Sequence, residues 1–300
     1  MEYPGLSVFS ISVFMVRSMT IPMISEDEAT RCLYAAVAAA LAAGREIMDV
    51  YQGRVDVQWK DDRSPLTEAD LRAHRVIKEV LERETPDTPV LSEEAADIPY
   101  EERRGWSSFW LVDPLDGTKE FIKRNDEFTV NIAYVVDAAP VAGVVYAPAL
   151  DRIWFGAAGV GAYRREIQDQ DRWPLTREAL TDGAVRLPLP ASERPYTVVA
   201  SRSHRNAETD AFIKSLSAAQ PKLALISAGS AIKLCLVAEG AADVYPRFGP
   251  TMEWDTAAGH AVCAACGIRV TQYPDGAPLR YNKESLLNPW FLIDGGGRDE

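Results

Sequence analysis

Cysteine is scarce in this chain of 300 residues, which holds only four. Cys263 and Cys266 are too close together for an easy loop-closing bridge, and Cys32 and Cys235 each stand apart. A scaffold held together by disulfides is therefore excluded. Free thiols fit a reducing compartment, so we expect the protein to be cytoplasmic.

Basic residues and long apolar runs are also in short supply. The 32 Lys and Arg side chains are outnumbered by 44 Asp and Glu, giving a net charge of −12, and they form no stripe. This argues against duplex nucleic acid as a main partner, and no obligate protein partner is evident. The apolar start, at residues 9–16, is much shorter than the roughly 20 residues that cross a bilayer and lacks the preceding positive charge of a signal peptide.

Residues 1–24 are therefore expected to form a disordered extension. An alternative is that they precede a true start at Met19 or Met23. Peripheral contact of this apolar segment with the inner face of a membrane also stays open.

The remaining composition is that of an ordinary globular protein, with 47 % apolar and 25 % charged residues. This supplies a sizeable core for one large domain or two packed domains. Helical periodicity begins after Ser25, whose spacing to Glu28 matches a capping box, and Gly53 is a suitable stop. A second helix is predicted from Thr67 to about Glu84.

From Phe109 onward the pattern changes to short strands at hairpin spacing, and near the C-terminus strands and helices alternate. A polar, proline-bearing stretch separates the two patterns. We predict an extension at 1–24, an α+β half at 25–165, a connecting insertion at 166–195 and an α/β half at 196–300. The predicted strands are 55–59, 90–91, 109–112, 128–136, 141–146, 153–155, 161–163, 197–200, 223–226, 243–245 and 268–271, and the predicted later helices are 206–216, 230–239 and 254–266.

The segment from residue 110 to residue 118 carries the clearest chemical signal. An apolar strand stops at Asp113, and Pro114 forbids helix continuation and fixes the backbone. Asp113 and Asp116 can then converge in one tight loop, with the carbonyl of Leu115 pointing the same way. Hard divalent cations such as Mg²⁺ prefer oxygen ligands of this kind.

The two residues that follow favour an anion beside those cations. Gly117 permits a close backbone approach, and Thr118 stands at the start of a possible short helix with free N–H groups. Carboxylates next to amide donors make sense where metal ions bridge them to a phosphate. Without cations, an acidic site would repel an anionic substrate.

Three other segments can bring acidic side chains to the same place. Glu93 and Glu94 follow a short strand, Asp70 lies at a helix start, and Asp255 lies in the first turn of a helix with small residues. Each has a simpler explanation, because paired glutamates are usually solvated and a single aspartate can complement a helix dipole. The segment at 113–118 can likewise be only a turn. The combination of all four segments favours a shared site.

In this order, the four segments resemble the metal-dependent, lithium-sensitive phosphatases of the inositol monophosphatase superfamily, and in detail its bacterial 3′(2′),5′-bisphosphate nucleotidase branch. The matching runs are Leu-Ser-Glu-Glu, Trp-Leu-Val-Asp-Pro-Leu-Asp-Gly-Thr-Lys-Glu-Phe-Ile and Phe-Thr-Val-Asn-Ile, followed later by Tyr-Pro-Arg-Phe-Gly-Pro and Trp-Asp-Thr-Ala-Ala-Gly-His, at 91–94, 110–122, 128–132, 245–250 and 254–260. The resemblance covers roughly Ser25 to the C-terminus. It implies an α/β fold, a layered αβαβα sandwich of the inositol monophosphatase and fructose-bisphosphatase type.

The resemblance also implies roles for individual residues. Two or three Mg²⁺ ions would be bound in the half at 25–165, with Asp113 bridging two of them; the implied ligands are Glu93, Asp113, the Leu115 carbonyl, Asp116 and Asp255. Asp70 and Thr118 would activate the attacking water, and Glu94 would assist as a further catalytic group. The amides of Gly117 and Thr118 would hold the phosphate.

The substrate's other end is implied more weakly, in the half at 196–300. In the family, the stretches that correspond to His204, Ser230 and Lys233 line the nucleotide pocket, and Lys119 and Glu120 belong to the extension that separates nucleotidases from inositol phosphatases. Asp255 would contact substrate as well as metal. Ser230 has an equally good alternative as a helix N-cap, and the alternative for Lys233 is a solvated helix charge.

Cys263 and Cys266, with His260 three residues before, also fit a redox or zinc motif. A closed zinc site needs four ligands, and only three are present here. The alanine-rich surroundings favour a buried packing helix instead.

The function that the resemblance implies is removal of the 3′-phosphate from adenosine 3′,5′-bisphosphate, leaving AMP and phosphate, with 3′-phosphoadenylyl sulfate as a further substrate. The implied setting is sulfur assimilation, where this by-product must be cleared. One alternative is an inositol or fructose phosphate phosphatase of the same superfamily. Another is a phosphonucleotide or metal sensor without catalysis.

Overall fold

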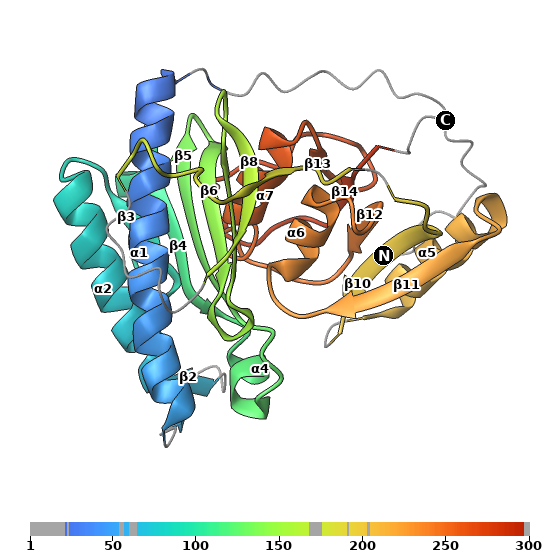
Figure 1. The fold of residues 1–300 in the computed structure, drawn as a ribbon, viewed down its shortest axis with the longest axis horizontal. Helices are drawn as coiled ribbons and strands as arrows, with labels where there is room; N and C mark the ends of the chain where they lie inside the picture. Colours follow the sequence, from blue (N-terminus) through green and yellow to red (C-terminus); the bar gives the residue numbers. More distant parts are fainter. Residues whose placement is uncertain are drawn as a thin grey trace.

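Two β-sheets alternate with layers of helices along the molecule (Figure 1). The computed structural model describes residues 22, 24–53, 57–59, 65–167, 176–190, 192–202 and 205–296. The expected extension at 1–24 lies almost wholly outside these residues, as do parts of the stretch at 166–195 and the whole of His204. The alternating layers confirm the predicted α/β sandwich.

The first layer is a pair of helices on one face of the larger sheet, α1 (Glu26–Gln52) and α2 (Glu68–Glu84) (Figure 1). The start predicted for α1 is confirmed, because the hydroxyl of Ser25 accepts a hydrogen bond from the N–H of Glu28 at 3.1 Å. Gly53 occupies the predicted C-cap. A two-stranded hairpin, β1 (Val57–Trp59) with β2 (Pro65–Thr67), leads into α2. Within the described residues, no helix combines the length and apolar character needed to cross a membrane.

The larger sheet has seven strands in sequence order from β3 to β9. β3 pairs parallel with β4, and every later pair is antiparallel, which confirms the predicted hairpin spacing. The connections hold the short helices η1 (Glu93–Ala95), α3 (Tyr100–Arg103), α4 (Thr118–Lys123) and η2 (Pro148–Leu150). The strands are β3 (Val90–Ser92), β4 (Ser108–Asp116), β5 (Thr129–Val136), β6 (Ala139–Ala147), β7 (Arg152–Ala157), β8 (Gly161–Glu166) and β9 (Val185–Leu187).

β4 is longer than its sequence predicts. We expected a strand that stops near residue 112 and a loop beyond it, whereas β4 continues through Asp116 with a register shift after Asp113. Asp113 pairs with Asn131 and Asp116 with Thr129, so one extra residue is accommodated on β4. The physical reason is that Pro114 cannot donate to the ladder, which favours a bulge at that point. The bulge keeps both aspartates at the end of a buried strand.

The second helix layer, α6 (Ile232–Ala238) and α7 (Ala257–Ala265), packs between the two sheets. α7 lies directly on β6, where Gly143 allows the contact: a Cβ there would stand 2.5 Å from the carbonyl oxygen of Ala258. The apolar core on this side joins both sheets to these helices. Small residues therefore set the spacing that brings the start of α7, next to Asp255, against the larger sheet.

The smaller sheet has five strands in the order β11, β10, β12, β14, β13, and α5 (Ala207–Ala219) packs on its outer face. β10 pairs parallel with both β11 and β12, an arrangement that fits the alternation of strands and helices in this half. β14 was not anticipated, and it pairs antiparallel between β12 and β13. The strands are β10 (Tyr196–Ser201), β11 (Leu223–Ala228), β12 (Val244–Arg247), β13 (Arg269–Gln272) and β14 (Phe291–Asp294).

The Cys-x-x-Cys motif serves packing between α6 and α7. The thiols of Cys263 and Cys266 donate to the carbonyls of Leu234 and Ala238, and all four cysteines are free. His260 turns away from the thiols, with Nδ1 3.0 Å from the hydroxyl of Tyr281. These contacts fit the buried packing helix that the sequence favours.

His260 should make the protein less stable in mild acid. Burial lowers its pKa from 6.5 to about 3. As the pH falls below 6.5, the unfolded chain binds a proton at this residue that the folded protein does not, so the free energy of unfolding should fall by up to about 1.4 kcal/mol per pH unit. Urea unfolding at pH 7.5 and 5.5 would measure this, and His260→Gln should show a weaker pH dependence. Equal pH dependence in both proteins would contradict this assignment.

Candidate active site

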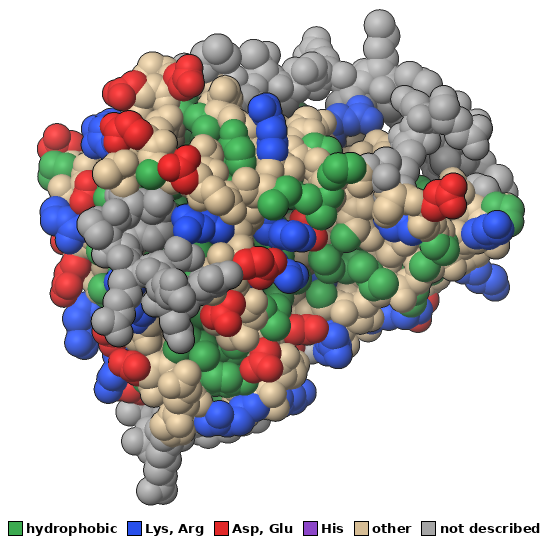
Figure 2. Space-filling view, in the orientation of Figure 1, with side chains coloured by type: hydrophobic (Ala, Val, Ile, Leu, Met, Phe, Trp, Pro, Cys, Tyr) green, Lys and Arg blue, Asp and Glu red, His purple; other side chains and the backbone are tan. Residues whose placement is uncertain are grey.

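A cavity of about 250 Å³ lies where the end of β4 and α4 meet the strand ends and helix starts of the smaller sheet. Eight of the predicted site residues line it: Asp116, Gly117, Thr118, Lys119, Glu120, Ser230, Lys233 and Asp255. The other lining residues are Ser201, Gly229, Leu234, Tyr245, Arg247, Pro250, Thr251, Thr256 and Phe291. The cavity thus joins residues that are more than a hundred positions apart. On the face drawn in Figure 2, acidic and basic side chains are interspersed.

The end of β4 is fixed by short-range contacts. The carboxylate of Asp113 accepts a hydrogen bond from the N–H of Leu115 at 3.1 Å, and Asn131 donates to the carboxylate of Asp116 at 3.3 Å. The hydroxyl of Thr118 lies 3.4 Å from the carbonyl oxygen of Leu115. These bonds hold the aspartates, the Leu115 carbonyl and the Thr118 hydroxyl close together.

Gly117 is required for two reasons. Its φ of +90° lies in the left-handed region, which favours glycine. A Cβ at this position would also stand 2.2 Å from the hydroxyl of Ser230. The turn that starts α4 can therefore approach the smaller sheet only because this residue has no side chain. The predicted short helix at Thr118 is confirmed, as α4.

The electrostatics of the site connect all four acidic segments. Burial raises the pKa of Asp113 well above its usual range, and the nearby charges of Glu93, Asp116, Asp255 and Asp70 raise it further. Burial and the charge of Asp116 also raise the pKa of Asp255 to about 8. Like charges that share a buried site disfavour ionisation. The structure thus gathers carboxylates whose ionised forms need a compensating cation.

The donor set fits a hard divalent cation such as Mg²⁺. It consists of one buried carboxylate, three half-buried carboxylates and a backbone carbonyl, with no soft ligand. Within the described residues, no three acidic, histidine or cysteine side chains stand close enough to form a ready-made cage. The charges of Glu93, Asp116, Asp255 and Asp70 nevertheless act on Asp113.

The remaining acidic residues of the predicted site are not among those that line the cavity. Asp70 is buried in the first turn of α2, and its charge reaches Asp113. Glu93 and Glu94 are half-buried in η1, directly after Ser92, whose hydroxyl lies 2.9 Å from Nδ1 of His74. None of these three carboxylates is a fully solvated surface charge.

Basic side chains also line the cavity. Lys233 is only 5 % exposed, so it is not a solvated helix charge, and burial lowers its pKa to about 8. Its ammonium group donates to the carbonyl of Ser230 and lies near Asp116, whose charge raises the pKa. Lys119, by contrast, is exposed at the rim, and Glu120 beside it is buried.

Arg247 is a cavity residue to which the sequence analysis gave no role. It is 8 % exposed at the end of β12, and one of its amino groups donates to the carbonyl of Pro250 at 2.8 Å. Its Nε is buried and has no hydrogen-bond partner among the described residues. A buried guanidinium with an unpaired donor is costly unless an anion satisfies it. The sequence held one indication of such a role, because this arginine ends an otherwise apolar strand.

Ser230 does not cap α6. The helix begins at Ile232, and the N-cap position, Ala231, has no side-chain capping bond. The Ser230 hydroxyl instead lies within hydrogen-bond distance of two carbonyl oxygens, at 2.9 Å from that of Asp116 and 2.7 Å from that of Glu127, and its single proton can be donated to either. It therefore ties the end of β4 to the start of the α6 segment and lines the cavity between them. His204, predicted to meet the base or ribose, lies outside the described residues.

The chain was compared with known families and proteins. The model of the inositol monophosphatase family matches residues 28–292. The 3′(2′),5′-bisphosphate nucleotidase CysQ of Escherichia coli strain K12 is 48 % identical over 260 residues, which cover 84 % of this chain and 94 % of the relative. The 3′(2′),5′-bisphosphate nucleotidase CysQ of Haemophilus influenzae is 33 % identical over 257 residues, covering 85 % of this chain and 90 % of the relative.

Solved structures give the same picture. The crystal structure of CysQ from Bacteroides thetaiotaomicron, a bacterial member of the inositol monophosphatase family, matches with a TM-score of 0.80 and 50 % identity, over 87 % of this chain and 96 % of that chain. An inositol monophosphatase from Anabaena matches with a TM-score of 0.62 and 25 % identity, over 88 % of this chain and 90 % of that chain.

Proposed function

The chain belongs to the inositol monophosphatase family, and we propose that it acts as a 3′(2′),5′-bisphosphate nucleotidase that hydrolyses adenosine 3′,5′-bisphosphate to AMP and phosphate. Two relatives with that named activity are 48 % and 33 % identical over most of the chain. The observation that carries the proposal is the cavity, whose lining combines the carboxylates of Asp116 and Asp255 with the nearly buried basic side chains of Lys233 and Arg247. Such a lining suits a substrate with two phosphates, one bound through cations and the other bound by basic side chains.

Enzymes of this family generally depend on Mg²⁺. The residues that would hold it here are Glu93, Asp113, the Leu115 carbonyl, Asp116 and Asp255, and we propose two or three ions. When bound, the cations would polarise the phosphate and activate a water for in-line attack. This set is supported by burial and by the mutual effect of the carboxylates on their pKa values.

The chain's own residues would direct the water and the phosphate. We propose that Thr118 orients the water through its hydroxyl, which already lies near the Leu115 carbonyl, while Asp70 takes up its proton. A threonine hydroxyl is a weak base alone, so a nearby carboxylate is needed. Glu94 would assist from η1, and the amides of Gly117 and Thr118 would hold the reacting phosphate. No covalent intermediate is involved.

The phosphate that is not cleaved would lie against the basic side chains of the cavity. Lys233 and Arg247 are both nearly buried, and charged donors bind phosphate oxygens more strongly than neutral donors do. Lys119, Glu120 and Ser230 also line the cavity, and we propose that they contact the substrate. We place the protein in the cytoplasm, because its four thiols are free.

A substrate panel with Mg²⁺ tests this function. We expect adenosine 3′,5′-bisphosphate to be hydrolysed with a kcat/KM about 100-fold above that for inositol 1-phosphate, because inositol 1-phosphate has no second phosphate to bind Lys233 and Arg247. Fructose 1,6-bisphosphate has two phosphates but no nucleoside, and it should also be a poor substrate. The product 5′-AMP should not be a substrate, 3′-phosphoadenylyl sulfate should be, and lithium should inhibit.

Other results would identify the alternatives. Equal or better hydrolysis of inositol 1-phosphate would favour an inositol phosphatase. Tight binding of adenosine 3′,5′-bisphosphate with no phosphate release would favour a sensor. Either outcome contradicts the proposed nucleotidase activity.

A further inference from the structure

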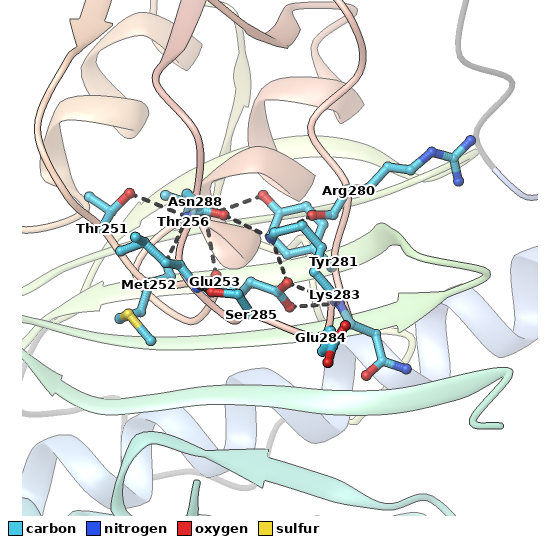
Figure 3. Close-up of polar contacts among 12 residues, drawn as sticks. Thr251, Met252, Glu253, Thr256, Arg280, Tyr281, Lys283, Glu284, Ser285 and Asn288 are labelled. Atoms are coloured by element: carbon cyan, nitrogen blue, oxygen red, sulfur yellow. Dashed lines mark hydrogen bonds and ion pairs between the residues drawn. The ribbon is translucent and has the colours of Figure 1, made fainter. Parts of the chain in front are cut away.

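Glu253 lies two residues before Asp255 in the loop between β12 and α7, and its side chain is fully buried. A buried carboxylate is unfavourable unless it is paired and hydrogen-bonded. Glu253 is not among the residues that line the cavity, and its side chain points toward the segment at 280–285 (Figure 3). Its role therefore depends on the groups that are hydrogen-bonded to its carboxylate.

The carboxylate of Glu253 binds one short turn of the chain. One oxygen accepts from the N–H of Asn282 at 2.6 Å, and the other accepts from the N–H of Lys283 at 3.0 Å and from the Lys283 ammonium at 2.5 Å (Figure 3). Asn282 has a φ of +62°, a conformation that side chains rarely adopt. The turn is thus held in an unusual shape by Glu253.

A second set of bonds fixes the backbone of the same loop. Asn288 donates through its amide to the carbonyl of Met252 at 2.8 Å and to the hydroxyl of Thr256 at 3.0 Å (Figure 3). The N–H of Glu253 donates to the carbonyl of Leu286 at 2.9 Å. Lys283 joins the two sets, because its ammonium also lies 3.3 Å from the side-chain oxygen of Asn288.

These bonds reach Asp255 through Met252. The carboxylate of Asp255 accepts a hydrogen bond from the N–H of Met252 at 2.8 Å, and the N–H of Asp255 donates to the Met252 carbonyl at 3.2 Å. That carbonyl is the one held by Asn288. The direction of the Asp255 carboxylate therefore depends on a loop that Glu253 and Asn288 fix from behind.

The turn at 282–284 is also hydrogen-bonded to Arg103, a residue distant in the sequence. Arg103, 3 % exposed at the end of α3, donates to the side chain of Asn282 at 2.9 Å and to the carbonyls of Lys283 at 2.6 Å and Glu284 at 2.8 Å. Asn282 donates back to the carbonyl of Arg103 at 2.7 Å. α3 follows η1, which carries Glu93. The turn thus connects the loop of Asp255 with the segment that follows Glu93.

We propose that Glu253, with Lys283 and Asn288, is a positioning group that sets the Asp255 carboxylate for divalent-cation binding. This inference rests on the metal site of the proposed function and adds residues that contact neither the cavity nor the substrate. A positioning role for Glu253 differs from that of a purely structural ion pair in one measurable respect. Loss of Glu253 should weaken cation binding in protein that is still folded.

The test titrates three matched variants with Mn²⁺ alone. The concentration of free Mn²⁺ at each step is measured by electron paramagnetic resonance. Glu253→Gln replaces one acceptor oxygen and removes the charge, and it should raise the Kd for Mn²⁺ about 10- to 100-fold. Asp255→Asn should weaken Mn²⁺ binding at least as much. The control is Glu239→Gln, which breaks another buried ion pair, with Arg164, at the far end of α6 from Lys233. It should lower the unfolding midpoint and leave the Kd unchanged.

Steady-state kinetics provide a second readout. Glu253→Gln should raise the Mg²⁺ concentration for half-maximal activity, while kcat at saturating Mg²⁺ and KM for adenosine 3′,5′-bisphosphate stay within about threefold of the original values. A variant that merely lost folded protein would show a lower kcat at every Mg²⁺ concentration.

The outcomes separate the two proposals. If Glu253→Gln shifts the Kd no more than Glu239→Gln does, the positioning role is overturned and the ion pair is only structural. If Asp255→Asn itself leaves Mn²⁺ binding unchanged, the metal assignment of the proposed function fails instead. Should Glu253→Gln not fold, Asn288→Ala carries the same test, because it keeps the ion pair and removes the bonds to Met252 and Thr256; an unchanged Kd in that variant also overturns the positioning role.

Discussion

Replacing Asp113 with Asn is expected to abolish phosphate release and, at the same time, to stabilise the protein in the absence of divalent cations. Asp113 is 1 % exposed, and its pKa is raised by burial and by four neighbouring carboxylates. Metal ions typically contribute several kcal/mol to such reactions. Loss of the proposed bridging ligand should therefore lower kcat/KM on the order of 1,000-fold or more.

The gain in stability follows from the direction of the pKa shift. The usual pKa of this carboxyl is 3.8, and the folded protein raises it. Above pH 3.8 the unfolded chain ionises at Asp113 while the folded protein resists ionisation, so the free energy of unfolding falls as the pH rises toward the folded pKa. Asn carries no charge and removes this loss. Unfolding in urea with a chelator present, at pH 5 and pH 8, should therefore show that Asp113→Asn is the more stable protein, with the larger difference at pH 8.

Asp87→Asn provides the control for this experiment, because it makes the same chemical change at an exposed turn after α2. It should change neither activity nor stability measurably. Addition of Mg²⁺ should raise the unfolding midpoint of the original protein and of the control, and much less that of Asp113→Asn. Near-normal turnover in Asp113→Asn would remove the bridging-ligand assignment.

The parts of the fold that the sequence predicted are those set by local chemistry. Ser25 begins α1 because its hydroxyl can reach an N–H three residues away, which is visible in four residues of sequence. The alternation of strands and helices after residue 195 likewise follows from local periodicity. β14 was missed because its place depends on antiparallel pairing with β12 and β13, which are far from it in the sequence.

In the candidate site, too, the features set by neighbouring residues were predicted, and those set by tertiary contacts were not. The carboxylates at 113 and 116 were found because proline and glycine mark their backbone, but their position in a bulged strand depends on pairing with Asn131 and Thr129. Ser230 was predicted either to cap a helix or to bind substrate. Its hydroxyl instead lies within hydrogen-bond distance of two backbone carbonyls at the end of β4 and in the segment before β5. Such contacts join residues more than 100 positions apart, and no local pattern encodes them.

Arg247 is a residue whose role depends on tertiary contacts and which should affect the choice of substrate. Its burial in β12 is a tertiary property, and only the structure shows that its Nε has no hydrogen-bond partner among the described residues. Replacing it with Met should lower kcat/KM for adenosine 3′,5′-bisphosphate about 100-fold, since a charge-assisted contact to phosphate contributes about 1.5–3 kcal/mol. For adenosine 3′-monophosphate, which lacks the second phosphate, the change should be less than about threefold.

The ratio of the two substrates makes this prediction specific. Arg247 also lowers the pKa of Asp255, so its removal affects the proposed metal site, but that effect is shared by both substrates and cancels in the ratio. Arg247→Lys keeps the charge and loses the planar fork, and it should recover only part of the activity toward the bisphosphate. Arg164→Met, a half-buried arginine that pairs with Glu239, should leave the ratio unchanged. If Arg247→Met lowers kcat/KM equally for both substrates, Arg247 acts at the reacting phosphate or through Asp255, and the second phosphate must bind elsewhere in the cavity.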